Sequence, residues 1–463
     1  MPSQRVLVYG MGSSGRAAAR CLLAEGVEVV ALDDAEGSGP VEAAAALGVE
    51  LVVRPDLDRL AALAASATEV VVSPGVPAHH PVFALGPSVS LVGEVELAWR
   101  HARTPMVAVT GTNGKTTVTT LVAAMLEASG VPALAAGNIG LPLLDAVEAA
   151  ARAATTSGAS AAPLVVAEVS SFQLALTDAF RPWVAAWCNF SPDHLDWHGS
   201  LPAYRAAKAK LWANAGPGTV PVANAEDAVV RAEAEAAAAR GASVVTFGLA
   251  DGDYHLAGTS LRTPAGDVIT TVEAMGRTLP HDLANALCAS AAALAAGATR
   301  AGCAAALASF SGLPHRVELV GEATGVRFYD DSKATTPGAT LAALAGFDSA
   351  VLIAGGRNKG LDLGVLRSAA PRLRAVVAIG DAAAEVRSAF DGACPVVDAS
   401  SMREAVTAAA GLARHGDVVV LSPACASFDW YRSYGERGDD FAREVRALGA
   451  VAGPGGGPGG EGR

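Results

Sequence analysis

The strongest chemical signal in the sequence is a glycine-rich segment, Gly111-Thr-Asn-Gly-Lys-Thr-Thr117, between the apolar run MVAVT and a helix-like run. A glycine turn between a strand and a helix points backbone N–H groups at a phosphate, and the helix start adds a favourable dipole. Lys115 is placed to reach the β- and γ-phosphates of a nucleotide, and Thr116 to bind Mg²⁺. The segment is a shortened P-loop, and an ordinary glycine turn is the alternative.

A second glycine segment, Gly10-x-Gly12-x-x-Gly15, follows the apolar run RVLVY near the N-terminus. Asp33 follows at the end of the next strand-like run. This pattern fits the dinucleotide fingerprint, in which the acid holds a ribose hydroxyl. It indicates a phosphate or sugar ligand more firmly than it indicates NAD, and a tight structural turn is the alternative.

An acid and an imidazole follow strand-like runs in the middle of the chain. Glu168 lies near the end of LVVAEV, and Asp193-His194 come after VAAWCNF. Magnesium prefers oxygen ligands and usually takes only one or two from the protein. These residues therefore suit a Mg²⁺ site beside the phosphate loop, although a histidine on such a turn is as often a plain surface residue.

Three polar segments follow strand-like runs in the last third: Asp331-Ser-Lys333-Ala-Thr335, Gly355-Gly-Arg-Asn-Lys359 and Ser422-Pro-Ala-Cys-Ala-Ser427. The carboxyl edge of a parallel sheet is where α/β proteins bind ligands. The two lysines indicate anion handling, with solvated loop lysines as the alternative. Cys425 is expected to pack rather than react, because an activated thiol needs an adjacent base.

Strand-like runs that alternate with helix-like runs must position these segments, which predicts an α/β fold with parallel sheets. At roughly 150 residues per domain, 463 residues suggest about three domains. We place them at residues 1–103, 104–313 and 314–463, with a flexible glycine-rich tail over 452–463. The expected strands include RVLVYG, Val27 to Leu32, Glu69 to Val72, MVAVT, LVVAEV, VAAWCNF, VRFYDD, AVLIAGG, AVVAIGD and DVVVLSP; the expected helices include Ala17 to Glu25 and 225–240.

Composition narrows the possible partners. The formal net charge is −12, so a general affinity for nucleic acid or an anionic membrane is not expected. The sequence shows no membrane-spanning run and no signal-peptide pattern. The six cysteines are scattered without a CxxC pair, which suits a reducing cytoplasm.

Taken together, the motifs resemble the Mur ligase family, the ATP-dependent amide-forming enzymes of peptidoglycan precursor synthesis. The resemblance covers nearly the whole chain and rests on these segments: GTNGKTT, AEVSSFQL, DHLDWHG, YRAAKAKLW, HDLANAL, LPHR and DSKAT. The segments GMGSSG, SPGVP, GNIG and SPACASFD are most similar to the members that add D-glutamate to UDP-N-acetylmuramoyl-L-alanine. The resemblance implies a Rossmann-like uridine-nucleotide domain, a central P-loop ATPase-type domain and a Rossmann-like C-terminal domain for the amino acid.

The resemblance also implies a nucleotide and metal site with ATP and two Mg²⁺ ions. Lys208 corresponds to a lysine that CO₂ carbamylates, which turns a cation into a metal-binding anion and requires a neutral, partly desolvated amine. From the residues alone, Lys208 is a plain lysine on a helix surface. The implied metal ligands are Thr116, Glu168, His194 and carbamylated Lys208. The implied ATP contacts are Gly111, Thr112, Asn113, Gly114, Lys115, Thr116, Thr117, Asn285, Arg316, Asp331, Lys333 and Thr335. The implied catalytic residues are Lys115, Glu168, His194, Lys208 and Lys333.

Two substrate sites follow from the same resemblance. The implied contacts of the UDP-substrate are Ser14, Asp33, Asp34, Ser73, Gly75, Gly137 and Asn138. The implied contacts of the amino acid are Lys359, Ser427, Phe428 and Tyr434. One departure stands out, because relatives can carry arginine after the acid of the second strand, whereas this chain has Asp33-Asp34-Ala35.

The implied reaction is ATP-dependent. A substrate carboxylate attacks the γ-phosphate, and the amine of D-glutamate then attacks the acyl phosphate, with ADP and phosphate released. The implied protein is a cytoplasmic monomer whose partners are the small-molecule substrates alone. A nicotinamide-dependent oxidoreductase, suggested by GMGSSG, and a non-catalytic ATP-binding regulator remain as alternatives.

Overall fold

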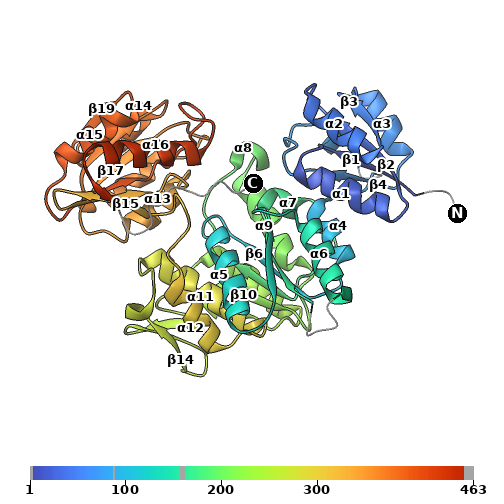
Figure 1. The fold of residues 1–463 in the computed structure, drawn as a ribbon, viewed down its shortest axis with the longest axis horizontal. Coiled ribbons are helices and arrows are strands. Elements are labelled where there is room, and N and C mark those ends of the chain that lie inside the picture. The colour runs from blue at the N-terminus through green and yellow to red at the C-terminus, as the bar shows by residue number, and fades with distance from the viewer. Residues whose placement is uncertain (1–3, 87–88, 157–161, 453–463) are drawn as a thin grey trace. The chain divides into compact units, whose positions relative to one another are not determined.

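The computed structural model describes residues 4–86, 89–156 and 162–452 (Figure 1). Its internal contacts divide the chain into two compact units. The first comprises Met1–Phe190, Trp197–Val272 and Asn285–Leu307, and the second comprises Ser191–Asp196, Glu273–Ala284 and Ala308–Arg463. Both units are built from parallel sheets with helical crossovers, so the predicted α/β class is confirmed.

The first unit begins with a five-stranded parallel sheet, drawn in blue in Figure 1, in the order β3-β2-β1-β4-β5. Its central strands are apolar and buried apart from charged residues at their ends, as expected where helices cover both faces of a parallel sheet. The strands are β1 Arg5–Tyr9, β2 Glu28–Asp33, β3 Glu50–Val53, β4 Glu69–Val72 and β5 Leu91–Gly93. The helices are α1 Ser13–Ala24, α2 Ser38–Leu47, α3 Leu57–Ala65 and α4 Glu94–His101.

The same unit contains a six-stranded parallel sheet in the order β11-β10-β9-β6-β8-β7. Its central strand β6 is buried at every position, and it ends at the glycine-rich loop. The strands are β6 Met106–Thr110, β7 Ala133–Gly137, β8 Leu164–Glu168, β9 Val184–Trp187, β10 Val220–Asn224 and β11 Val245–Phe247. The helices are α5 Lys115–Ala128, α6 Leu143–Thr156, α7 Ser171–Ala175, α9 Leu201–Ala213, α10 Ala228–Ala239 and α12 Arg300–Ser309.

Helix α4 joins the two sheets of the first unit through two buried carboxylates. Glu96 is fully buried and accepts hydrogen bonds from the backbone N–H groups of Asp178, Ala179 and Phe180 at 2.9, 3.2 and 3.1 Å. Glu94 accepts from the N–H of Leu144 at 2.9 Å, and burial raises its pKa. These bonds tie the N-terminal sheet to the backbone around the central sheet.

A small antiparallel sheet was not predicted from the sequence. Its strands are β12 His255–Ala257, β13 Ser260–Arg262 and β14 Val268–Thr271. The division between the units falls inside helices α8 Leu195–His198 and α11 Pro280–Ala295, and the last two residues of α12 belong to the second unit. Short 3₁₀ segments cover Pro81–Ala84, Val272–Ala274 and Leu363–Arg372.

The second unit, orange to red in Figure 1, holds a seven-stranded sheet in the order β19-β18-β17-β20-β16-β15-β21. Strand β15 pairs antiparallel with β16, while the strands from β16 through β19 are parallel. The strands are β15 Glu318–Ala323, β16 Val326–Asp330, β17 Ala350–Gly355, β18 Leu373–Ile379, β19 Val396–Ala399, β20 Val418–Leu421 and β21 Val451–Ala452. The helices are α13 Pro337–Leu344, α14 Ala383–Phe390, α15 Met402–Leu412 and α16 Tyr434–Ala447.

The predicted strands agree closely with these bounds. The run VAAWCNF forms a strand only as far as Trp187, because the next residues turn toward the glycine-rich loop. Ala452, the first residue of the expected flexible tail, pairs with Gly321 of β15, and residues 453–463 lie outside the described residues. Every helix among the described residues is too short or too polar to cross a membrane.

Candidate functional site

The glycine-rich segment forms a tight loop between β6 and α5. Gly114 directly precedes α5 with a φ of 82°, a conformation that favours glycine. A Cβ at Gly114 would lie 2.4 Å from the side-chain oxygen of Asn285 on α11. The structure therefore brings together two predicted ATP contacts that are distant in the sequence. Thr116 and Thr117 lie in the first turn of α5, as phosphate and metal binding at a helix start requires.

Two side chains hold the backbone of this loop. Lys115 Nζ donates to the carbonyl oxygens of Gly111 and Thr112 at 3.0 and 2.9 Å. Asn189 accepts from the N–H of Asn113 at 2.9 Å and donates to its carbonyl at 3.1 Å, so one amide fixes both polar groups of that residue. Asn189 was not predicted, although its position just after β9, at the same sheet edge as the loop, could have signalled it.

Glu168 lies at the carboxyl end of β8 and is 2% exposed. Its Oε1 accepts from Asn138 Nδ2 at 2.9 Å, and its backbone carbonyl accepts from the N–H of Asn138. A Cβ at Gly137 would lie 2.4 Å from that carbonyl oxygen. The predicted metal ligand and the two predicted substrate contacts are thus one cluster. The buried Oε2 has no hydrogen-bond partner among the described residues, which fits an oxygen ligand for a cation.

Lys208 lies on α9 and is 1% exposed, so its interpretation as a surface lysine is wrong. Its Nζ donates to the carbonyl oxygen of Gly111 at 2.7 Å and lies 5.0 Å from the centre of the Tyr204 ring. The lysine is therefore buried directly beneath the glycine-rich loop. A buried amine at this position fits the chemistry expected of a carbamylated ligand.

The N-terminal glycine turn lies at the carboxyl edge of the first sheet. A Cβ at Gly15 would lie 1.8 Å from the carbonyl oxygen of Gly10, so the turn excludes any larger residue there. Ser73 donates to the same carbonyl at 2.6 Å. Asp33 accepts from the N–H groups of Met11 and Ala35 at 2.6 and 2.8 Å, which joins the turn to the end of β2. Ser14, at the start of α1, and Gly75, after β4, lie at this same edge.

Asp34 has neighbours that sequence reasoning did not identify. Tyr9 donates to one of its carboxylate oxygens at 2.7 Å, and His80 Nε2 lies 3.1 Å from the other. Burial and Asp34 together raise the pKa of Tyr9 well above its usual value. Arg54, from the end of β3, donates through Nε to the backbone carbonyl of Asp34 at 2.7 Å. An arginine therefore contacts the backbone of Asp34, while its guanidinium also pairs with Glu36 at 2.6 Å.

In the second unit, Asp331 follows β16 and is buried. Ser422 donates to its carboxylate at 2.7 Å across the sheet edge. Burial raises the pKa of Asp331 to about 7. Lys333 Nζ lies 3.7 Å from the centre of the Tyr434 ring, within the range of a cation–π interaction, so predicted ATP and amino-acid contacts are neighbours.

Arg437 of α16 holds these loops together and was not predicted. It is 1% exposed and donates to the side chain and carbonyl of Ser332 at 2.9 and 2.8 Å, and to the carbonyl of Cys425 at 3.1 Å. The buried Ser427 follows in the second of these loops, whereas Phe428 is 65% exposed. Cys425 is buried and burial raises its pKa to about 12, which agrees with packing rather than nucleophilic chemistry.

His194, the predicted metal ligand in this unit, is held by its neighbour Asp193. Asp193 accepts from the backbone N–H of His194 at 2.8 Å, and its other oxygen lies 3.2 Å from His194 Nε2. Lys359 Nζ lies 3.5 Å from the same carboxylate. Asp193 therefore links a predicted metal ligand to a predicted carboxylate contact, and it belongs to the Asp193-His194 pair that the sequence already indicated for a Mg²⁺ site.

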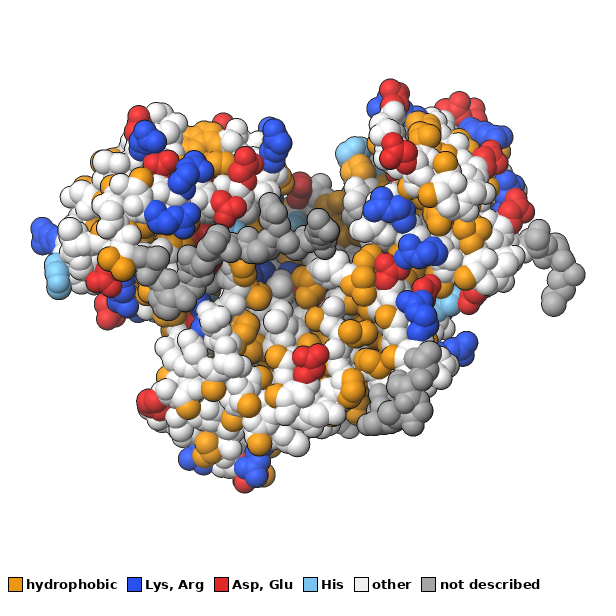
Figure 2. Space-filling model, viewed as in Figure 1, with side chains coloured by type: hydrophobic (Ala, Val, Ile, Leu, Met, Phe, Trp, Pro, Cys, Tyr) orange, Lys and Arg blue, Asp and Glu red, His pale blue; other side chains and the backbone are white. Residues whose placement is uncertain are grey.

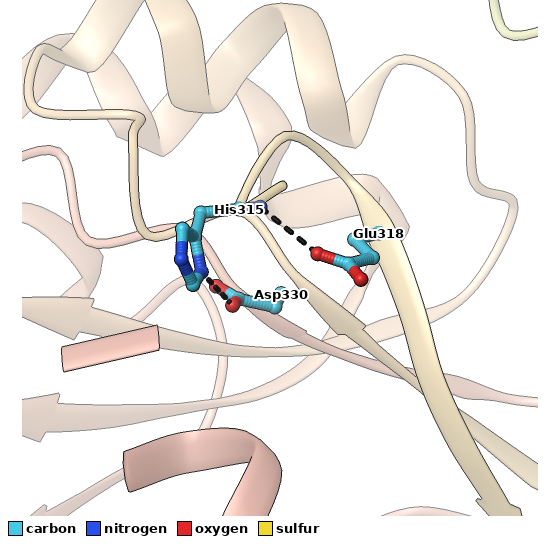
Figure 3. Close-up of side chains that lie close together, drawn as sticks. All are labelled: His315, Glu318 and Asp330. Atoms are coloured by element: carbon cyan, nitrogen blue, oxygen red, sulfur yellow. Dashed lines mark hydrogen bonds and ion pairs between the residues drawn. The ribbon is translucent and has the colours of Figure 1, made fainter. Parts of the chain in front are cut away.

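The turn that carries Arg316 is anchored by a polar cluster (Figure 3). His315 Nδ1 lies 2.7 Å from Asp330 Oδ2, and the N–H of His315 donates to Glu318 at 3.0 Å. The hydrogen bond from His315 to Asp330 raises the pKa of the imidazole. These three are the one group of histidine, cysteine and acidic side chains, among the described residues, with metal-compatible spacing. Because they bond to one another, their evident role is to fix the turn.

The predicted residues fall into separate clusters. The glycine-rich loop, Asn285, Glu168 and Lys208 belong to the first unit, as do the UDP-substrate contacts. His194, Arg316, Asp331, Lys333, Thr335 and the amino-acid contacts belong to the second. Thr335 is half-buried in the loop after β16.

Comparisons with known proteins cover nearly the whole chain. The family model for the Mur ligase middle domain matches residues 109–293, and that for the Mur ligase glutamate ligase domain matches residues 315–425. A protein of Frankia casuarinae named UDP-N-acetylmuramoylalanine--D-glutamate ligase is 44% identical over 96% of this chain and 94% of its own length. A protein of Thermobifida fusca with the same name is 41% identical over 96% of this chain and 98% of its own length.

Solved structures agree on the fold. A pseudomurein peptide ligase type C from Methanothermus fervidus has a TM-score of 0.60 at 15% identity, and covers 96% of this chain and 100% of its own. The UDP-N-acetylmuramate-alanine ligase MurC from Thermotoga maritima has a TM-score of 0.58 at 20% identity, and covers 96% of this chain and 99% of its own. The predicted three-domain α/β architecture is therefore confirmed. On this full-length similarity, the chain belongs to the Mur ligase family.

Proposed function

We propose that this chain is an ATP-dependent ligase that joins D-glutamate to UDP-N-acetylmuramoyl-L-alanine and releases ADP and phosphate. The observation that carries this conclusion is full-length similarity, at 36–44% identity, to relatives named for this reaction. An oxidoreductase would leave the glycine-rich loop and Asn285 without a role. The regulator alternative is disfavoured because Glu168, His194 and Lys208 are all retained.

The reaction needs charge to be neutralised around the phosphate that is transferred. The substrate carboxylate attacks the γ-phosphate of ATP, which gives an acyl phosphate and ADP. The amine of D-glutamate then attacks the acyl carbon, and phosphate leaves. Phosphoryl transfer depends mainly on positioning and electrostatic stabilisation. Lys115, at the glycine-rich loop, and Lys333, in the loop after β16, supply protein cations for this purpose.

ATP and Mg²⁺ are the cofactors of this family. We propose that Thr116, Glu168, His194 and Lys208, as its carbamate, hold two Mg²⁺ ions. The support is the chemistry of the donors: Glu168 has a buried oxygen without a hydrogen-bond partner, and Lys208 is buried beneath the phosphate loop. Bound Mg²⁺ would neutralise developing charge on the phosphates.

The substrates divide among three domains in our proposal. Residues 1–103 hold the uridine nucleotide through the edge around Ser14, Asp33, Asp34, Ser73 and Gly75. Residues 104–313 hold ATP, with Gly137 and Asn138 toward the middle of the UDP-substrate, and residues 314–463 hold D-glutamate through Lys359, Ser427, Phe428 and Tyr434. The protein acts in the cytoplasm as a monomer.

In each unit, positive and negative side chains are interspersed on the face drawn in Figure 2.

The decisive experiment is ADP release by the purified protein with Mg²⁺ and ATP. We expect turnover with UDP-N-acetylmuramoyl-L-alanine plus D-glutamate, and none when either is omitted or when L-glutamate replaces the D-isomer. Turnover with another amino acid would overturn the substrate assignment. Tight ATP binding without turnover would favour the regulator. ADP release by Lys208→Ala, measured with and without added short carboxylic acids, then tests whether Lys208 acts as a carbamate.

A further inference from the structure

The turn that carries Arg316 is strained on both sides of that residue. His315 has a φ of 60° and Val317 a φ of 48°. A positive φ is uncommon in residues other than glycine, and it is a genuine outlier in a β-branched residue such as valine. Such strain persists only where the surrounding structure enforces it, and it concentrates at functional sites. Arg316, between the two strained residues, is a predicted ATP contact.

Contacts from the C-terminal sheet hold His315, and the carboxylate of Asp331, after β16, accepts from the backbone N–H of Val317. His315 is held by Asp330 and Glu318 (Figure 3), and its carbonyl accepts from the N–H of Lys333 at 3.1 Å. These bonds fix the peptide groups that flank His315. They leave the carbonyl groups of Arg316 and Val317 to be held from elsewhere.

Arg277 holds both of those carbonyls. Its Nη1 donates to the carbonyl oxygen of Val317 at 3.1 Å, and its Nη2 donates to that of Arg316 at 3.3 Å. A planar guanidinium presents its donors in a rigid fork, so one side chain can set the orientation of two successive peptide groups. All of these residues belong to the second unit.

Arg277 is itself fixed by its neighbours. Its Nε donates to Asp282 Oδ1 at 3.1 Å, and the two side chains are 14% and 8% exposed. A Cβ at Gly312 would lie 2.8 Å from Arg277 Nη1, so the chain approaches the guanidinium closely just before the strained turn. The arginine is thus anchored by an acid on one side and packed against glycine on the other.

We propose that Arg277 is a positioning residue that holds the strained turn 315–317 in the conformation in which Arg316 binds the nucleoside triphosphate. The inference rests on the proposed function, because it takes Arg316 as an ATP contact. Arg277 itself touches neither ATP nor the reacting atoms. Its loss lets the turn relax, and nucleotide binding weakens while the binding of the UDP-substrate, whose contacts lie in the first unit, does not change.

The test combines steady-state kinetics with direct binding of ADP and Mg²⁺ by calorimetry. We expect Arg277→Gln to raise the KM for ATP and the Kd for ADP at least tenfold, and to leave the KM for the UDP-substrate within twofold. Arg277→Lys keeps the charge but not the fork, and we expect about a threefold effect. Guanidinium ion at tens of millimolar should restore part of the ADP affinity to Arg277→Ala.

The control is Arg374→Gln. Arg374 lies at the start of β18 and pairs with Asp417, which directly precedes β20. Both residues lie where the strands of the sheet begin, away from the carboxyl ends that carry the predicted site. We expect Arg374→Gln to lower stability without changing either nucleotide constant, and Arg374→Ala should show no rescue by guanidinium. An unchanged ADP affinity in Arg277→Gln overturns the inference. If Arg277→Gln does not fold, an unchanged ADP affinity in Arg277→Lys overturns it instead. Because ADP binding needs neither the UDP-substrate nor glutamate, failure of the proposed ligase reaction would be seen separately.

Discussion

Replacing Glu96 with alanine should be among the most destabilising single changes in the first unit. Glu96 is fully buried on α4, and its carboxylate accepts from the consecutive N–H groups of Asp178, Ala179 and Phe180. It also pairs with Arg100 one turn later, at 3.1 Å. Alanine would remove the acceptor for three backbone donors in the segment between α7 and β9.

The magnitude follows from those three donors. A buried donor left without a partner costs about 1–3 kcal/mol. Three donors give an upper bound of about 9 kcal/mol, but water can enter the space that the truncated side chain leaves. Arg100 contributes little to the loss, because it is partly exposed and keeps Glu69 at 2.9 Å. We therefore expect Glu96→Ala to lower the free energy of unfolding by about 3–5 kcal/mol, which is about half of that upper bound.

The assay is urea unfolding followed by tryptophan fluorescence. Five of the six tryptophans, at positions 99, 183, 187, 197 and 212, belong to the first unit, so the signal reports mainly on that unit. Glu148→Ala serves as the control, because its partner Arg152 is 68% exposed and the pair lies at the surface of one helix, and we expect a change below about 0.5 kcal/mol. A loss below about 1 kcal/mol in Glu96→Ala would refute the claim that this carboxylate holds the two sheets together.

Three further predictions concern Gly438 of α16, Asp331 and Asn189. Gly438→Ala places a Cβ 2.2 Å from His315 Nδ1, and thermal unfolding should show a loss of about 1–3 kcal/mol; an unchanged melting temperature would contradict the packing described. Asp331 has a pKa of about 7 in the folded chain and 3.8 in the unfolded chain, so folding favours its protonated form. Its contribution to the free energy of unfolding is therefore complete below about pH 4 and is lost as the pH rises toward 7. The loss approaches about 4 kcal/mol, and Asp331→Asn should show a flatter profile of stability between pH 5 and 8; identical profiles would count against it. Asn189→Ala frees both polar groups of Asn113, and it should raise the KM for ATP about tenfold; an unchanged KM would show that the loop holds its shape without it.

The parts of the site that sequence reasoning located share one physical cause. Parallel strands bring their carboxyl ends to the same edge, so the turns after β6 and β8 had to lie near each other. The pairing of Gly137 with Glu168 follows from that rule. The burial of Lys208 does not, because this lysine comes from helix α9 and not from a strand end. The strands themselves were recognisable, because burial on both faces leaves the middle of each strand apolar.

The residues that were missed act through partners distant in the chain. Arg277 lies 40 residues from Val317, and Arg437 lies 105 residues from Ser332, so no local spacing links them. Their signal in the sequence is only that of a charged residue on a helix or loop. Burial distinguishes them from solvated side chains, and burial is set by packing that a local pattern does not contain.

The absence of a cation at Ala35 also shows that a local pattern misses contacts from distant parts of the chain. A comparison of motifs finds no cation after the acid pair of β2, and from position alone this edge of the N-terminal sheet would lack one. Arg54 comes from the end of the neighbouring strand β3, donates to the carbonyl of Asp34 at 2.7 Å and pairs with Glu36 at 2.6 Å. Since adjacent parallel strands end at the same edge, a residue lost from one strand end can be replaced from the next without any trace in the local motif. A missing motif residue is therefore weak grounds for a missing function until the neighbouring strand ends have been inspected, and here the neighbouring strand places an arginine against the backbone of Asp34.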